Sequence, residues 1–291
     1  MRAVFRHELS SYFTGVTGYV FSAFLLLFTG IYTMVYNLQS ASVHFEYVLG
    51  SMSFVFLIIV PILTMRVLAE ERRQKTDQLL YSLPLTMTQV VMGKYLALLT
   101  QLAVPAAPMA VICLYPVVLS AYGNVYLPAA YGAIVGFFFL GMALLAIGMY
   151  ISSVTESQAV AAGLCFVVML VNYFLSDLAG FASSTAYSSL AALAVTALIV
   201  CGIVYLMTKN GFVSLILAAV LEAGLIGGYL WDSSRFEGLF PQIISQLSLF
   251  GRFYTIVNGV FDVTAIVYYL SVTGFFLFLS VQSLEKRRWS E

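Results

Sequence analysis

Charged side chains are scarce in this chain. Only 9% of its 291 residues are Asp, Glu, Lys or Arg, whereas an average soluble domain has about 25%. Hydrophobic residues make up 62% of the sequence, and so few polar side chains cannot cover the surface of a soluble globule of this length. The composition excludes an ordinary soluble domain and predicts a chain that crosses a membrane several times.

Residues for metal binding and catalysis are also few. Cys113, Cys165 and Cys201 lie far apart inside apolar runs, and no Cys or His pair has the spacing of a metal site. We interpret the cysteines as small packing residues. The sequence has no P-loop, HExxH or GxSxG motif, and its zero net charge offers no field to attract nucleic acid. We therefore expect a non-catalytic chain that binds no metal or cofactor itself.

Long apolar runs account for most of the sequence. Each of eight runs is long enough to cross a bilayer as a helix, which predicts an all-α polytopic bundle in one domain, residues 1–291. An even number of spans puts both termini on one side. If that side is the cytoplasm, every Lys and Arg except Arg235 and Arg252 lies on it or close to it. The runs are residues 16–36, 48–69, 95–119, 127–151, 158–178, 187–207, 212–231 and 263–284.

Two segments fit neither a span nor a simple loop. Residues 1–14 have a stripe of large apolar side chains at helical spacing, which predicts a helix along the inner membrane surface; a frayed basic tail is the alternative. Residues 232–262 are too apolar for a free external loop and are interrupted by Pro241 and Gly251. They predict an external re-entrant or surface-lying hairpin.

The longest polar stretch, residues 70–94, separates the second run from the third. A connection between two helices needs only a few residues, so this length indicates a further role. Charged residues extend the second span, a short amphipathic helix follows, and a proline ends it. We interpret residues 70–90 as a helix presented to a cytoplasmic partner; a solvated loop that anchors the topology is the alternative. The residues assigned to this contact are Glu70, Glu71, Arg72, Arg73, Thr76, Leu79, Leu80, Leu83 and Pro84.

Glu222 lies midway along the run 212–231. A carboxylate at that depth costs a few kcal/mol to insert, which makes it a candidate for a functional intramembrane polar site. No Lys or Arg lies within a neighbouring span, so a protonated glutamate hydrogen-bonded between helices is the other interpretation.

The polar stretch reads E-E-R-R-x-x-T-x-x-L-L-x-S-L-P-L-T-x-x-x-V-V-x-G-K-Y-L-A. This pattern resembles that of ABC-2-type transporter permeases, in which it follows the second span. The resemblance implies a type V exporter-like architecture, with residues 70–90 as the coupling helix that fits into a groove of the ATP-binding subunit. Lys75 stands where family members often have glycine. The residues that match are Glu70, Glu71, Thr76, Leu79, Leu80, Pro84, Gly93 and Lys94.

The C-terminal part is similar to the permease of the gliding-motility (Gld-type) ABC subfamily. Arg252, Gly259 and Asp262 belong to this second match, in the external segment that the family places as a re-entrant hairpin before the last span. The family core usually has six spans, so residues 187–231 are interpreted as a two-helix insertion that contains Glu222. The remaining matching residues are Tyr268, Tyr269, Glu285, Arg287 and Trp289.

The resemblance implies the permease subunit of an ATP-driven exporter in the bacterial cytoplasmic membrane. ATP and Mg would then bind a separate ATP-binding subunit. The other expected partners are a second copy or a related permease, a Gld-type accessory membrane protein and the lipid bilayer. A secondary transporter driven by ions or protons through Glu222 is the alternative.

Overall fold

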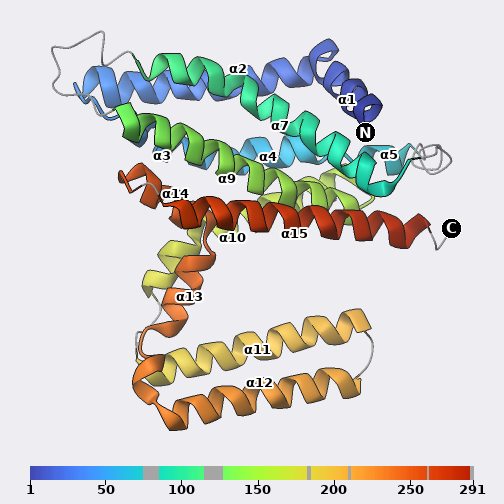
Figure 1. Cartoon of the computed structure of the whole chain (residues 1–291), viewed down its shortest axis with the longest axis vertical. Helices are drawn as coiled ribbons and strands as arrows, with labels where there is room; N and C mark the ends of the chain where they lie inside the picture. Colours follow the sequence, from blue (N-terminus) through green and yellow to red (C-terminus); the bar gives the residue numbers. More distant parts are fainter. Residues whose placement is uncertain (75–84, 115–126, 182–184, 209–210, 261, 289–291) are drawn as a thin grey trace. The chain divides into compact units, whose positions relative to one another are not determined.

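The computed structural model describes residues 1–74, 85–114, 127–181, 185–208, 211–260 and 262–288. All regular elements of these residues are helical (Figure 1), which confirms the predicted fold class. The elements are α1 (Arg2–Thr14), α2 (Val16–Thr33), the π-helical η1 (Met34–Gln39), α3 (Glu46–Met52), η2 (Ser53–Val55), α4 (Phe56–Thr64), α5 (Ala69–Arg73), α7 (Met87–Ile112), α9 (Leu127–Val154), α10 (Gln158–Phe181), α11 (Ala186–Thr208), α12 (Gly211–Trp231), η4 (Ser233–Phe236), α13 (Leu239–Leu247), α14 (Leu249–Val257) and α15 (Val263–Arg288).

Among the described residues, six helices are long and apolar enough to cross a membrane. A seventh span is possible if Leu215–Trp231 and Ser233–Leu247, which are bent by 119° at Asp232, count as one. Sequence alone predicted eight, and the difference lies in residues 187–231. The described apolar part of α11, Ala186–Ile199, is short for a span, and α12 continues into a sharp bend. The six spans are Val16–Gln39, Glu46–Arg73, Met87–Ile112, Leu127–Val154, Gln158–Phe181 and Val263–Arg288.

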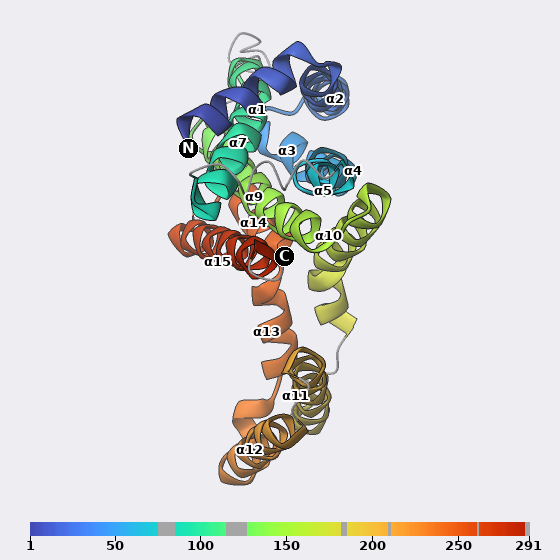
Figure 2. The ribbon, with the colours of Figure 1, turned by 90° about the vertical axis from the view of Figure 1, so that its right-hand side faces the viewer.

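The chain divides into two compact units. Unit 1 comprises Met1–Val171 and Arg252–Glu291, and unit 2 comprises Asn172–Gly251. Unit 1 is built around α9, which packs against α3, α4, α7 and α15 (Figure 2). Most of the α9 surface is buried inside the protein. This placement explains why α9 is apolar around its whole circumference rather than along one stripe.

Small residues let other helices approach α9 closely. Gly141 lies against Phe56 of α4 and Leu102 of α7, and a Cβ at this position would come within 2.9 Å of both side chains. Gly148 lies directly against Thr64 at the end of α4. Glycine is common at such contacts in membranes, where helices associate through close packing rather than through expulsion of water.

The last span, α15, packs along α9 with one continuous face. Its buried residues recur every three or four positions, as expected for a helix with a single packed side. Small and hydroxyl side chains alternate on this face with larger ones. They are Ala265, Tyr269, Thr273, Leu277, Ser280 and Leu284.

In unit 2, α11 and α12 form an antiparallel helical hairpin (Figure 1), and α11 also packs against η4 and α13. Many of the described apolar side chains of this hairpin are exposed, including Leu230 and Trp231 at the end of α12. The loop that enters α14 is fastened inside the same unit. The Asn172 side-chain oxygen accepts a hydrogen bond from the Leu249 backbone N–H at 3.0 Å, and Tyr173 packs edge-on against Phe250.

Candidate functional site

Ionised side chains gather at one end of unit 1. There α1, α5, the first turns of α7 and the last turns of α9 and α15 come together (Figure 1). We call this the polar end. It contains α5, which leads directly into residues 75–84, so it is the part of the described structure nearest in sequence to the predicted partner contact.

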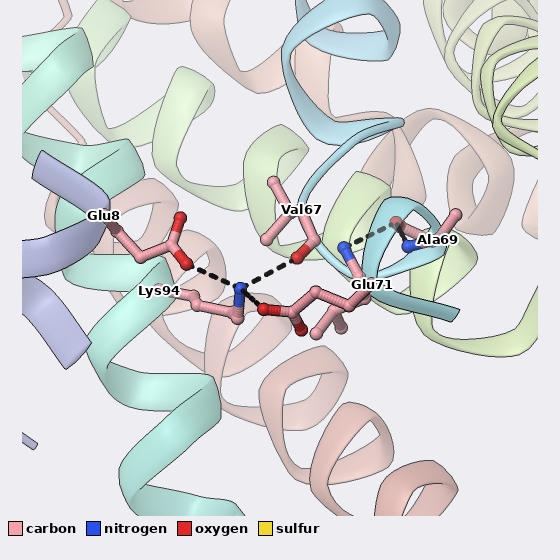
Figure 3. Close-up of polar contacts among 7 residues, drawn as sticks. Glu8, Val67, Ala69, Glu71 and Lys94 are labelled. Carbon is pink, nitrogen blue, oxygen red and sulfur yellow. Dashed lines mark hydrogen bonds and ion pairs between the residues drawn. The ribbon is translucent and has the colours of Figure 1, made fainter. Parts of the chain in front are cut away.

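Lys94 of α7 is the most deeply buried charge at the polar end, with 2% of its side chain exposed. Its ammonium lies 2.7 Å from Glu8 Oε1 of α1 and 2.7 Å from Glu71 Oε1 of α5. It also donates to the Val67 carbonyl oxygen at 3.1 Å (Figure 3). A lysine ammonium has three N–H donors, so these three acceptors satisfy it completely. The triad Glu8–Lys94–Glu71 joins α1, the end of the second span and α7.

The local sequence explains why these side chains meet. Thr86 accepts a hydrogen bond from the Gln89 N–H and caps α7, whereas the sequence alone left Thr86 and Thr88 as alternative caps. Gly93 precedes the lysine, and a Cβ at this position would lie 3.1 Å from Val4 of α1. The absent side chain lets α1 pack closely on α7, which brings Glu8 within reach of the lysine.

Tyr12 continues this contact one helical turn after Glu8. Burial, together with the Glu8 and Glu70 carboxylates, raises the pKa of the Tyr12 phenol above its ordinary value. Glu8 belongs to the same helix as Tyr12, and Glu70 belongs to α5. The geometric link between the N-terminal helix and the end of the second span is the Glu8–Lys94–Glu71 triad.

Arg72 attaches α5 to the end of α9. Its guanidinium donates to the Thr155 carbonyl oxygen at 3.0 Å and to the Ser153 carbonyl oxygen. Ser152, which is fully buried, accepts from the backbone N–H groups of Leu68 and Ala69 at 3.2 and 3.1 Å. These bonds satisfy backbone groups that have no partner at helix ends, and they hold the start of α5 against α9.

Arg287 caps the same end of α9 from α15. It donates to the Val154 carbonyl oxygen at 2.9 Å and lies 3.8 Å from Glu156. Cations are favourable at a helix C-terminus because the exposed carbonyl groups carry partial negative charge. The end of α9 is therefore held by arginines from two different helices.

The other candidate residues of unit 1 lie around the start of α15. Arg252 stacks on the Tyr268 ring, with its guanidinium carbon 4.3 Å from the ring centroid. Gly259 has φ +87°, a conformation that glycine adopts without strain at the end of α14. Asp262 caps α15 by accepting bonds from the Thr264 hydroxyl and N–H, which lower the pKa of its carboxyl below the ordinary value.

Glu222 lies on α12 in unit 2. One oxygen of its carboxylate is buried and has no hydrogen-bond partner among the residues that the structure describes. The remainder of the side chain is partly exposed. Nothing described places a second ionisable group beside it, so the structure brings it into no site with the other candidates.

Comparison with protein families matches residues 9–223 to the family described as ABC-2 family transporter protein. The chain belongs to this family. The match includes α11 and the first half of α12, the segment interpreted from the sequence as an insertion, whereas residues 252–289 of the Gld-type resemblance lie outside it. No curated relative matches the sequence.

As an ABC-2 permease, this chain is the membrane-embedded part of a transporter, and ATP is hydrolysed by a partner subunit. Of the predicted coupling residues, Glu71 and Arg72 take part in the contacts between helices described above. Arg73 is exposed, and Glu70 accepts from Gln74 at 3.3 Å. Thr76, Leu79, Leu80, Leu83 and Pro84 lie outside the described residues.

Sequence analysis did not assign a role to Glu8 or Ser152. One signal for Glu8 is its spacing from Tyr12, which places both side chains on the same face of a helix. Lys94 appeared in the matching pattern, but no pattern could show that its partner comes from α1. No sequence feature could have predicted the contacts of Ser152 and Arg72, because their partners are backbone groups more than 80 residues away in the chain.

Proposed function

We propose that this ABC-2 permease is an exporter that receives the push of its ATP-binding subunit through residues 70–90. The anchoring of α5 carries the proposal. Arg72 fastens α5 to α9 and Glu71 fastens it to α7, so a force on residues 75–84 passes into two spans of unit 1. A solvated loop that only sets topology would not need two buried cationic anchors at its base.

In this proposal, ATP and Mg bind the partner subunit, and closure of two such subunits moves residues 70–90 of two permeases. The permeases then alternate between inward-facing and outward-facing states. Two permease chains are required, either two copies of this chain or this chain with a related one. Both termini lie in the cytoplasm, and the bacterial cytoplasmic membrane is the site of transport. Residues 1–14 lie along the inner surface, residues 187–231 are a two-helix addition, and residues 232–262 form the external re-entrant segment.

The resemblance of the C-terminal residues adds one partner to this proposal, a Gld-type accessory membrane protein. Arg252, Gly259 and Asp262 support the likeness through sequence only. In the structure, Gly259 lies at the end of α14 and Asp262 caps the start of α15, so both have a role in the local backbone. Co-purification with a membrane protein other than the ATP-binding subunit and the permease tests this part.

The decisive experiment changes the predicted docking helix while leaving its anchors intact. We expect Leu79→Gly with Leu80→Gly to abolish transport-coupled ATP hydrolysis, because the apolar stripe that fits the partner groove is lost. Membrane insertion should be unchanged. A matched control is Leu38→Gly, an exposed leucine on η1. Normal coupled hydrolysis in the double variant would contradict the proposal.

Glu222 supplies the alternative, because its buried carboxylate oxygen has no described partner. In a proton-coupled transporter, protonation of this group would accompany each transport cycle. Vesicles that contain the permease without its ATP-binding subunit would then move substrate in response to a pH gradient, and Glu222→Gln would stop them. Under the ATP-driven proposal, such vesicles transport nothing.

A further inference from the structure

The ammonium of Lys94 has one more counter-charge than it needs. A buried cation requires a partner, because leaving it unpaired away from water costs several kcal/mol. One carboxylate at 2.7 Å would meet that need, yet Glu8 and Glu71 both lie at this distance. The two carboxylates retain 19% and 25% side-chain exposure, so each keeps contact with solvent. Since neutralisation needs only one of them, the second adds a connection between helices.

The three acceptors come from two separate parts of the chain. Glu71 and the Val67 carbonyl belong to the end of the second span, which continues into residues 75–84. Glu8 belongs to α1, which packs mainly on α7 and α2, whereas α5 packs on α9. Lys94 therefore connects α1, through Glu8, to the start of residues 70–90, through Glu71.

The contact between α1 and α7 is tight beside this bridge. At Gly93, an added Cβ would lie 3.1 Å from Val4 and 3.3 Å from the Met1 carbonyl oxygen. The Glu8 carboxylate lies 2.7 Å from the ammonium of Lys94, the residue that follows Gly93. Packing and charge therefore fasten α1 at adjacent points, so a shift of α5 and α7 is passed to α1 through short, directed contacts.

We propose that Glu8 and Lys94 are positioning residues that make α1 a moving part of the coupling apparatus. When the ATP-binding subunit displaces residues 75–84, α5 moves with them. The ion pair between Glu71 and Lys94 passes this displacement to α7, and the ion pair between Lys94 and Glu8 passes it to α1. This inference rests on the proposed docking role of residues 70–90. It assigns to the N-terminal helix a mechanical task in the transport cycle, in addition to contact with the membrane surface.

The two carboxylates should have separable effects. Without the Glu8 carboxylate, Lys94 still pairs with Glu71, so α5 stays fastened to α7 and the ATP-binding subunit still docks. What is lost is the transfer of motion to α1. ATP hydrolysis should then continue with less transport, which loss of docking alone would not produce.

The test uses the complex with its ATP-binding subunit in lipid nanodiscs. Spin labels go on the exposed residues Ser10 of α1 and Gln74 after α5, in a background with the buried Cys113, Cys165 and Cys201 changed to alanine. With Glu8 intact, we expect one narrow label distance with and without a non-hydrolysable ATP analogue. With Glu8→Gln, we expect the distance to change by several Å when the analogue binds, because α1 no longer follows α5.

The same variants are measured in proteoliposomes. Transport per ATP hydrolysed should fall roughly tenfold in Glu8→Gln, a typical size for loss of coupling between distant sites. Gly93→Val keeps every charge but displaces α1 from α7, and it should uncouple in the same way. The control is Glu285→Gln on α15, since Glu285 has no ion pair with any described residue; it should behave as the unaltered chain does.

Three outcomes decide between the proposals. Unchanged coupling and an unchanged label distance in both Glu8→Gln and Gly93→Val would overturn the role of α1 alone. Failure of the unaltered permease to bind any ATP-binding subunit would overturn the docking role of residues 70–90 together with this inference. Uncoupling in both variants, with the partner still bound, supports it.

Discussion

At the residue scale, three buried or half-buried cations organise the polar end of unit 1. Lys94 joins carboxylates from two helices, and Arg72 and Arg287 cap the carbonyl groups that end α9. The sequence counts all three as residues that set membrane orientation, and the structure adds a second task to each. A positive charge near a membrane face can be both a topological signal and a structural bond.

Adjacent arginines in α5 should differ sharply when changed. Arg72→Gln removes a buried donor to two carbonyl oxygens of the α9 end, and we expect a loss of about 1–3 kcal/mol in stability. Arg73 is exposed, so Arg73→Gln should leave stability within about 0.5 kcal/mol and weaken binding of the ATP-binding subunit. Melting in detergent and co-purification separate the two effects. Equal melting temperatures would contradict the capping role of Arg72.

Asp262 caps α15, and we expect the stabilisation of the folded protein by this cap to depend on pH. Its carboxyl pKa is lowered in the folded protein, chiefly by the Thr264 hydroxyl and N–H bonds. Because the folded pKa lies below the unfolded value, the contribution is present above pH 4 or so and is lost as the pH falls through the folded pKa.

The change Asp262→Ala should therefore lower the melting temperature at pH 7, and the gap to the unaltered chain should close in strongly acidic solution. Melting curves in detergent between pH 7 and pH 3 measure this. Thr185→Ala, which removes another exposed cap at the start of a helix, is a control without a carboxyl group, so its gap should not vary in the same way. A constant gap for Asp262→Ala would argue against the carboxylate cap.

At the element scale, α9 depends on residues that have almost no side chain. Gly148 lies directly against Thr64, so Gly148→Val should force α4 and α9 apart and cost about 1–3 kcal/mol. Gly163 on α10 has open space around its Cβ position, and Gly163→Val should change the melting temperature little. Similar losses for both variants would show that helix propensity, not close packing, is the cause.

Sequence patterns predicted some elements well and others poorly, for physical reasons. The spans of unit 1 were recovered because long apolar runs mark them, and a threonine after Pro84, either Thr86 or Thr88, indicated the start of α7. The predicted span 212–231 ends where the chain bends, but its apolar length alone could not show whether α12 crosses the membrane or belongs to a bent pair with the helices that follow. The triad was beyond prediction, since Glu8 and Lys94 are 86 residues apart and only the packing of α1 on α7 brings them together.

At the scale of the whole molecule, the number of spans determines on which side each connection lies. Both ends of unit 1 carry exposed residues suited to chemical labelling, and their assignment follows from the bias in Lys and Arg. The polar end contains α1 and the end of α15, so a single orientation places both of these helix ends on the same side as α5. The orientation is a proposal that two cysteines can test.

Single cysteines at Gln74 and Ser40, both exposed, should react with a membrane-impermeant maleimide from opposite sides. We expect Gln74→Cys to be labelled only in inside-out vesicles and Ser40→Cys only in intact cells. Because each variant keeps the same buried native cysteines, background reaction is equal in both. Reversal of the pattern would overturn the proposed topology and move the docking segment outside.

The central position of α9 also has a consequence for biosynthesis. The helix that packs most extensively on α9 is α15, which is made only after α10 to α14 have left the ribosome. During that interval, the face of α9 that packs against α15 has no helix against it, and lipid or an insertion chaperone must cover that face. Folding of unit 1 is therefore completed late, and a chain cut before residue 263 would reach the membrane with its central helix half covered, a substrate for membrane proteases rather than a smaller permease.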